Sequence, residues 1–407
     1  MAITYRERML DNGLRLIGEV DPAAHSAAIG FFVRTGARDE PASSMGVSHF
    51  LEHMMFKGTE DMSAEALNSA MDDLGASNNA YTSSELTCFY AHVLPEALPD
   101  AARLLGRMMH PALREGDFET ERGVILEEIA MYDDNPFWVL MEAAGERHYQ
   151  GHALGHRVLG TKATIAALPV STMREYFRER YTAEATVVAL AGALDMDEVA
   201  RLIEGLPAVW THGLPPPRDV PQRVGGGRFE IERPNVSRGY VIGLWPAPSM
   251  QDNLRHAARL LAQVIGAPGN SRLHWALVEP GLADEAVASY MGQDGTGEFV
   301  VYASGDPDKA DQIETVIRGE LRAVVDGLQE HDLERLRAKA ATAVTVGGER
   351  PADRMQRLGS RWTLLGDYLP LEEELEQVRS VTLDDLREVA RRYGMEPTTW
   401  GMLRPGG

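Results

Sequence analysis

Three side chains in residues 44–59, SMGVSHFLEHMMFKGT, have types and a spacing that could bind a metal ion and use it. His49 and His53 are four positions apart, so on a helix their imidazoles lie one turn apart on the same face. That spacing lets both reach one cation, and Zn²⁺ suits imidazole best. Glu52 lies on the same face and can take a proton from a metal-bound water. The resulting HxxEH pattern is the inverse of the HExxH zinc motif. The alternative interpretation is that these three residues form an ordinary solvated polar face of the helix.

A third protein ligand is needed, because catalytic zinc sites usually combine three with a water. Residues 117–132, DFETERGVILEEIAMY, also have a helical pattern, and Glu121 and Glu128 share one of its faces. The apolar members of that face are Phe118, Val124, Ile125 and Tyr132. Glu127 points toward the solvent side, and a buried carboxylate is costly without a cation, so Glu128 is the preferred ligand. The alternative is an ordinary amphipathic helix with salt-bridged glutamates.

Two helices must bring these groups together. The first carries an apolar stripe on the face opposite the histidines, made of Val47, Phe50, Leu51, Met54 and Met55. We expect Ser43 or Ser44 as its N-cap, Lys57 in its last turn and Gly58 just after its end. These limits predict a helix of about 13 residues.

Three elements, HFLEH at 49–53, the pair Glu121-(x6)-Glu128 and NNAYTSSELT at 78–87, together resemble the inverzincin zinc peptidases related to pitrilysin, insulysin and the mitochondrial processing peptidase. The likeness runs from about residue 12 to 195, and more weakly through the second half. It implies a short two-domain, bacterial-type subunit that acts as a zinc-dependent endopeptidase, cleaving unfolded or extended peptides inside a chamber.

The resemblance also implies roles for individual residues. His49, His53 and Glu128 would ligate one Zn²⁺ per chain, Glu52 would be the general base that activates the zinc-bound water, and Glu121 would have a catalytic role as a carboxylate supporting the site.

A further role concerns substrate binding. The resemblance implies that a strand through Asn79, Ala80 and Thr82 is a sheet edge that pairs with substrate. Such pairing binds extended peptides through main-chain hydrogen bonds. The alternative is a plain internal strand.

The chain divides at a segment rich in proline and glycine, residues 205–227, which is typical of a linker. On either side the sequence repeats, with Ile29-Gly30 recurring as Ile242-Gly243. Short alternating strands mix with long amphipathic helices in both halves. We therefore predict an α+β fold of two similar domains from a duplication, each an antiparallel-rich sheet packed with helices. The expected division is a zinc-binding catalytic domain at 1–208, a linker at 209–227 and a similar domain without a metal site at 228–407.

The second half lacks the ligand set. The helices of the two halves correspond at an offset of 215 residues, so Glu121 corresponds to Leu336 and Glu128 to Ala343. His256 and His274 have no metal-binding partner one turn away, so both are interpreted as structural or surface residues.

One departure from the resemblance predicts a partner. Active members carry an Arg and a Tyr in a segment like LRxxxxLGY, whereas residues 277–284 read LVEPGLAD, with Val278 and Asp284 near those places. We therefore expect a heterodimer with a homologous subunit that supplies the Arg/Tyr pair, or else a homodimer.

Composition and net charge limit the partners and the cellular location that we expect for this protein. The net charge of −21 disfavours nucleic acid and anionic membranes as partners and favours basic peptides, since the acidic excess lies mainly in the N-terminal half. A single cysteine, Cys88, and the absence of an apolar signal or membrane span predict a cytoplasmic protein. Two alternatives stay open: a non-catalytic structural subunit of the same superfamily that retains a zinc site, and a zinc enzyme acting on small molecules.

Overall fold

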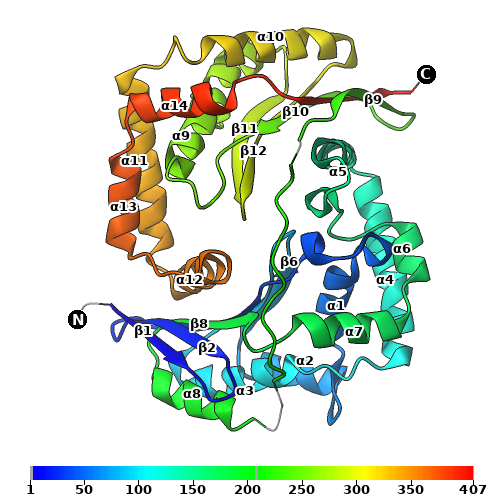
Figure 1. The fold of residues 1–407 in the computed structure, drawn as a ribbon, viewed down its shortest axis with the longest axis vertical. Coiled ribbons are helices and arrows are strands. Elements are labelled where there is room, and N and C mark those ends of the chain that lie inside the picture. Colours follow the sequence, from blue (N-terminus) through cyan, green and yellow to red (C-terminus); the bar gives the residue numbers. More distant parts are fainter. Residues whose placement is uncertain (1–2, 207–209, 223, 407) are drawn as a thin grey trace. The chain divides into compact units, whose positions relative to one another are not determined.

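The computed structural model describes residues 3–206, 210–222 and 224–406, which form two compact units. The first contains Met1–Ile129, His156–Pro217 and Val346–Tyr368, and the second contains Ala130–Gly155, Arg218–Thr345 and Leu369–Gly407. Each unit is one sheet with helices packed on it (Figure 1). Each unit therefore takes one segment from the opposite half of the sequence. Residues 210–222, within the expected linker, contain no helix or strand.

The first unit is built on a six-stranded sheet in the order β1-β2-β8-β3-β7-β6, in which only β2 and β8 pair in parallel. Its strands are β1 (Thr4–Met9), β2 (Arg15–Val20), β3 (Ala27–Val33), β6 (Ser77–Thr82), β7 (Thr87–Val93) and β8 (Thr186–Gly192). A small hairpin, β4 (Gly58–Thr59) and β5 (Met62–Ser63), lies outside this sheet.

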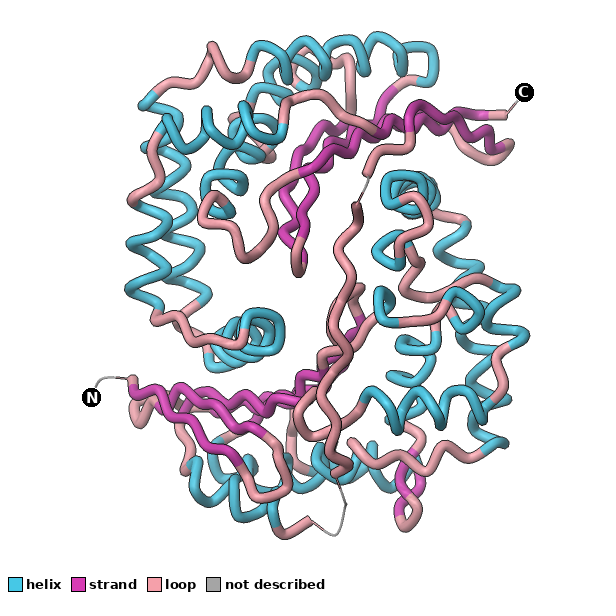
Figure 2. The backbone as a smooth tube through the Cα atoms, viewed as in Figure 1, coloured by secondary structure: helices cyan, strands magenta, loops and turns pink. Residues whose placement is uncertain are grey.

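The helices of this unit are α1 (Val47–Met55), α2 (Ala64–Asp73), α3 (Leu98–Met108), α4 (Glu115–Asp133), α6 (Lys162–Ala167), α7 (Val170–Arg180), α8 (Met196–Glu204) and α12 (Pro351–Leu365). The last turn of α4 belongs to the second unit. Short 3-10 turns are η1 (Ala37–Asp39), η2 (Ala42–Ser44) and η3 (Pro95–Ala97). Helices α3 and α8 pack on one face of the sheet and α12 packs on the other (Figure 2).

Strand β3 shows why both faces are covered. Its alternate residues Ile29 and Phe31 enter the core with α1 and α3, whereas Ala28 and Phe32 face α12. Gly30 lets α12 come close, because a Cβ there would lie 2.5 Å from the sulfur of Met355. The strand is thus apolar throughout, as expected for a strand buried on both faces.

A buried ion cluster also holds α12 on the first sheet. Glu19 of β2 is 1% exposed and accepts hydrogen bonds from Arg354 Nε (2.9 Å) and from Arg357 (2.7 Å), both of α12. The hydroxyl of Tyr368 donates to the same carboxylate. These contacts satisfy a charge that would be costly if left unpaired.

The second unit repeats the design. Its sheet has the order β11-β12-β10-β13-β9, in which only β13 and β9 pair in parallel. The strands are β9 (Gly227–Arg233), β10 (Gly239–Pro246), β11 (Glu285–Gln293), β12 (Thr296–Gly305) and β13 (Thr399–Pro405). The helices and turns are α5 (Pro136–Tyr149), η4 (Ala153–Gly155), α9 (Arg255–Gly266), the π-helical η5 (His274–Val278), η6 (Pro307–Lys309), α10 (Ala310–Ala323), α11 (Glu330–Gly347), α13 (Leu371–Arg379) and α14 (Leu383–Tyr393).

Helix α5 occupies the place on this sheet that α12 occupies on the first. Its apolar side chains pack against β10, and Tyr149 at its end donates a 2.7 Å hydrogen bond to the buried carboxylate of Glu298. The first sheet without β1 reads β6-β7-β3-β8-β2 and the second reads β11-β12-β10-β13-β9, so the strands correspond one to one in chain order. The α+β fold and the antiparallel-rich sheets are confirmed. No helix in the described part of the chain is long and apolar enough to cross a membrane.

Candidate metal centre

Helix α1, which carries the HxxEH residues, is shorter than the sequence predicted. It spans Val47–Met55, nine residues, and begins after Gly46, whose φ is +93°. The prediction of Ser43 or Ser44 as N-cap is wrong, because Ala42–Ser44 forms its own 3-10 turn before the chain reverses at that glycine. The helix also ends before Lys57, which therefore lies beyond its last turn.

A buried carboxylate, rather than a serine hydroxyl, holds the start of α1. Glu40 is 4% exposed and accepts hydrogen bonds from the backbone N–H groups of Gly46 (2.6 Å) and Ser48 (2.7 Å). Burial raises the pKa of Glu40 to about 8, although these hydrogen bonds act in the opposite direction. Glu40 thereby satisfies helix donors that otherwise lack a partner. This role was not predicted from the sequence, because Glu40 lies seven positions before Val47, the first residue of the helix.

The polar face of α1 is mostly buried. His49 is 8% exposed and Glu52 is 9% exposed, while the apolar stripe opposite them is fully buried. Both sides of the helix are thus covered, by the core on one side and by neighbours that include β6 on the other. Among the residues of α1 only His53 is partly exposed, at 26% of its side chain. A helix so nearly buried has little reason to carry ionisable groups unless they have a function or a partner.

Helix α4 presents its two carboxylates to α1. The side chains of Glu121 and Glu128 are 6% and 24% exposed, whereas Glu127 points to solvent. The expectation that Val124 shares the buried face is wrong: it is 49% exposed, because it lies at the margin of that face, and Ile129 enters the core instead.

The three predicted ligands converge. One ligand atom from each of His49, His53 and Glu128 lies within 4.8 Å of the others. Glu128 Oε2 is 3.7 Å from Nε2 of His49 and 3.6 Å from Nε2 of His53. Tetrahedral ligands about 2.1 Å from a zinc ion are about 3.4 Å apart, so the spacing fits that ion with little movement.

The protonation of His49 also suits a ligand. Burial, aided by the neighbouring His53, lowers the pKa of His49 to about 3, so its ring is neutral near pH 7. Its Nε2 atom faces Glu128 and keeps the free electron pair when Nδ1 carries the proton of the neutral ring. A neutral imidazole with an unused electron pair is what metal binding requires.

Glu121 does not reach the converging atoms but contacts one ligand from behind. Its Oε1 atom is 2.9 Å from Nδ1 of His53, and its Oε2 atom is 2.5 Å from Nζ of Lys57. When the ring donates from Nδ1, its Nε2 atom keeps the free electron pair and faces Glu128. This is the arrangement of a carboxylate that orients a metal-binding histidine.

Glu52, the predicted base, accepts a 2.6 Å hydrogen bond from the hydroxyl of Thr82. Burial raises the pKa of Glu52, and this hydrogen bond lowers it. A buried carboxylate with a raised pKa takes and releases a proton more readily near neutral pH.

The predicted substrate strand is β6, and it is the outermost strand of its sheet. Within the described residues it pairs with β7 alone and packs beside α1. The alternative of an internal strand is therefore wrong. Asn79 is exposed, Ala80 is buried, and the side chain of Thr82 is turned to Glu52.

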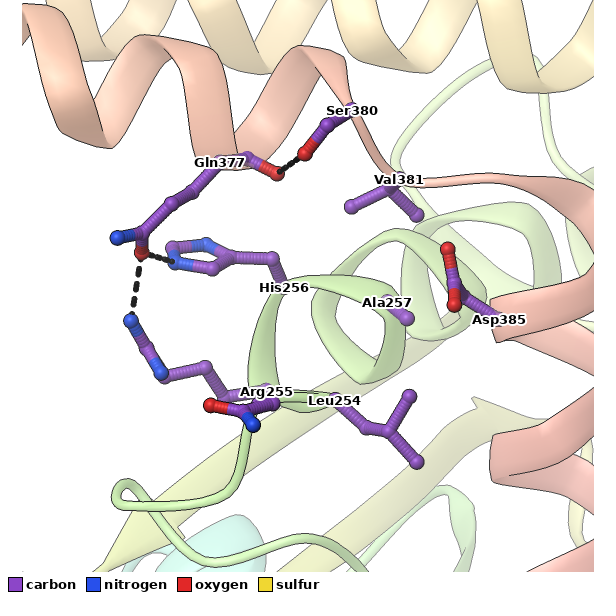
Figure 3. Close-up of a pocket in the computed structure, with 9 residues that line it drawn as sticks. Leu254, Arg255, His256, Ala257, Gln377, Ser380, Val381 and Asp385 are labelled. Carbon is purple, nitrogen blue, oxygen red and sulfur yellow. Dashed lines mark hydrogen bonds between the residues drawn. The ribbon is translucent and has the colours of Figure 1, made fainter.

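The second unit has no comparable cluster in the part of the chain that the structure describes. Leu336, which corresponds to Glu121 in the sequence repeat, lies in the hydrophobic core of the second unit. His256 is buried and its Nε2 is 3.1 Å from Oε1 of Gln377, which also accepts a 2.6 Å hydrogen bond from Arg255 beside a pocket of about 350 Å³ (Figure 3). His274 packs edge-on against Trp275. Both histidines make structural contacts.

Sequence models of one peptidase family match both halves of the chain. The sequence model of the insulinase family, peptidase family M16, matches residues 15–162, and that of the M16 inactive domain matches residues 168–340. The chain belongs to peptidase family M16. The inactive-domain match lies mostly in the half where the ligand set is absent.

Relatives within the M16 family cover nearly the whole chain. An uncharacterised zinc protease of Streptomyces coelicolor is 33% identical over 95% of this chain and 87% of its own length. An uncharacterised zinc protease of Bacillus subtilis is 29% identical over 97% of this chain and 96% of its own length.

Solved structures show the same fold at lower identity. A protease from Helicobacter pylori has a TM-score of 0.91 at 20% identity, covering 99% of this chain and 100% of its own. A chain of complex III2 from Candida albicans has a TM-score of 0.87 at 16% identity, covering 98% and 96%.

Proposed function

We propose that this M16 chain is a zinc-dependent endopeptidase whose metal site is His49, His53 and Glu128. The observation that carries the proposal is the convergence of these three side chains beside the buried carboxylate of Glu52. The donor set is two imidazoles and a carboxylate, a common set of protein ligands for catalytic zinc. One zinc per chain is expected.

Zinc in such a site lowers the pKa of a bound water and polarises a carbonyl group. Glu52 takes the proton from the attacking water and later gives it to the leaving amine. Thr82 holds Oε2 of Glu52, so that the other oxygen is free for this transfer. Glu121 keeps the ring of His53 oriented through its Nδ1 atom.

The substrate is an unfolded or extended peptide, which pairs with the outer edge of β6. Exposed main-chain groups at a sheet edge bind peptides with little demand on side-chain identity. The net charge of −21 favours basic peptides, so cleavage of a basic peptide should slow as salt is raised, more than cleavage of a neutral one. A small-molecule substrate would make no use of this strand.

A second subunit completes the site. The positions expected to supply an Arg and a Tyr hold Val278, which has no polar group, and Asp284, whose carboxylate accepts a 2.6 Å hydrogen bond from Arg238. Neither can donate to an oxyanion. We propose that a homologous subunit with the Arg/Tyr pair joins this chain around a closed chamber, with a homodimer as the other form. The single cysteine, Cys88, fits a reducing compartment such as the cytoplasm.

The test uses the purified chain and an internally quenched peptide. Alone, the chain should bind about one zinc and cleave weakly, because loss of one oxyanion donor typically costs about 10²- to 10³-fold. Adding a homologous chain that carries the Arg/Tyr pair and lacks HxxEH should restore cleavage. Strong cleavage by the chain alone would contradict the proposal that a second subunit completes the site.

The alternative is a structural subunit that keeps its zinc without catalysis. The missing donors at Val278 and Asp284 are the observation in its favour. It predicts no cleavage with any partner, and equal behaviour of the wild type and Glu52→Gln.

A further inference from the structure

Lys57 contacts the carboxylate that orients a proposed zinc ligand. Its Nζ atom is 2.5 Å from Oε2 of Glu121, and Oε1 of the same carboxylate is 2.9 Å from Nδ1 of His53. Each oxygen therefore has its own donor. The three residues form a chain that ends at the ring whose Nε2 atom faces Glu128.

Because Glu121 is buried, Lys57 is important for keeping its carboxylate in one orientation. The side chain of Glu121 is 6% exposed, and its ion-pair partners among the described residues are Lys57 and His53. A buried carboxylate that loses one of two partners turns to satisfy the vacated oxygen. Such a turn would move Oε1 away from the histidine, since both oxygens belong to one rigid planar group.

The main chain around Lys57 is itself fixed. Its N–H donates to the carbonyl of Met54, and its own carbonyl accepts a 3.3 Å hydrogen bond from Arg114. A second hydrogen bond joins Arg114 to the carbonyl of Thr59. Arg114 immediately precedes α4, the helix of Glu121, so the lysine is anchored beside the carboxylate that it contacts.

We propose that Lys57 is a positioning residue of the zinc site, which acts through Glu121 to hold the Nε2 atom of His53 toward the metal. This inference rests on the proposed function, because it requires zinc at that site. It adds to the site a lysine that lies outside both the HxxEH helix and the pair Glu121 and Glu128. The contact that Glu121 makes behind His53 is of a kind worth about 10- to 100-fold in metal affinity, and Lys57 holds Glu121 in place for it.

The experiment measures the zinc dissociation constant of the full chain by competition with a chromophoric chelator. The variants are Lys57→Met, Glu121→Gln and the double variant, with Lys57→Arg as the conservative replacement. Arg107→Met is the matched control, because Arg107 is 29% exposed against 32% for Lys57 and pairs with Asp61 rather than with Glu121. Melting of each zinc-free protein is recorded first, so that a loss of fold is not read as a loss of affinity.

Lys57→Met should weaken zinc binding about 10- to 100-fold while the zinc-free melting temperature stays close to wild type. Lys57→Arg should recover most of the affinity, and Arg107→Met should leave it unchanged. In the Glu121→Gln background, Lys57→Met should add less than about threefold, because the two residues act in series.

Three results would overturn the inference: a Lys57→Met affinity within twofold of wild type, an equal loss in Arg107→Met, or losses that multiply in the double variant. If Lys57→Met does not fold, Lys57→Gln takes its place in the same cycle. A wild-type chain that binds no zinc would overturn the proposed function as well, whereas normal zinc binding by the wild type and Lys57→Met alike would overturn this inference alone.

Discussion

The hydroxyl of Thr82 donates a 2.6 Å hydrogen bond to Oε2 of Glu52. Thr82 is the last residue of β6, the edge strand, so one residue joins the strand proposed to bind substrate to the proposed base. Burial raises the pKa of Glu52, and this hydrogen bond opposes that rise. The side chain expected to touch substrate is thus turned to the base.

Thr82→Val tests this relationship, because valine has the shape of threonine without the hydroxyl. We expect kcat to fall about 10-fold, since a misplaced base loses much of its effect, while KM and zinc content stay near wild type. Thr82→Ser should keep most activity. The assay is peptide cleavage by the zinc-loaded chain with its partner present. A change confined to KM would show that Thr82 acts on substrate binding instead.

Glu52→Gln tests the base itself. Glutamine keeps the size of the side chain and can still accept the hydrogen bond of Thr82, but it cannot take a proton. Activity should fall about 10²- to 10⁴-fold with zinc content unchanged. Retention of more than a tenth of the wild-type rate would exclude Glu52 as the base.

The buried pair of Arg354 and Glu19 predicts a stability effect. Their side chains are 6% and 1% exposed, so Arg354→Met leaves a buried carboxylate with fewer partners. Breaking such a pair typically costs about 3 to 5 kcal/mol. Arg387→Met is the control: it breaks an exposed pair with Asp384 and should cost less than about 0.5 kcal/mol. Urea unfolding measures both, and equal midpoints would refute the role of the buried pair.

Glu298 predicts a pH dependence. Burial raises its pKa from 4.5 to about 7, while the hydrogen bond from Tyr149 acts against the rise. The folded state therefore binds this proton more tightly than the unfolded state. Its contribution to stability is full below about pH 4.5 and is lost as the pH rises through about 7, up to about 3 kcal/mol in all.

The measurement is the melting temperature of the wild type and of Glu298→Gln at several values between pH 5 and pH 8. The difference between the two proteins should shift steadily against the wild type as the pH rises. A constant difference across this range would show that Glu298 does not titrate there.

Much of the fold could be predicted from local pattern. The recurrence of Ile29-Gly30 as Ile242-Gly243 indicated two similar domains, each with an antiparallel-rich sheet. The exchange of α5 and α12 between the units could not be predicted. An amphipathic helix shows which of its faces is buried but not which sheet it packs on, and contacts such as Arg354 with Glu19 join residues 335 positions apart.

The residues of the site likewise divide into those that could be predicted from the sequence and those that could not. Histidines one turn apart, and glutamates two turns apart, converge because helix geometry fixes their faces. The contacts of Glu40, Lys57 and Thr82 join separate segments, so no spacing in the sequence reveals them. The serine N-cap prediction was wrong for a related reason, since a distant carboxylate can satisfy helix donors as well as a local hydroxyl.

Zinc content by mass spectrometry tests the central claim most directly. After dialysis against a weak chelator, the wild type and Glu127→Gln should retain about one zinc per chain, because Glu127 points to solvent beside the proposed ligand Glu128. His49→Ala and His53→Ala should retain less than about a tenth of that, since each removes one of three ligands. Zinc content unchanged in either histidine variant would contradict the account.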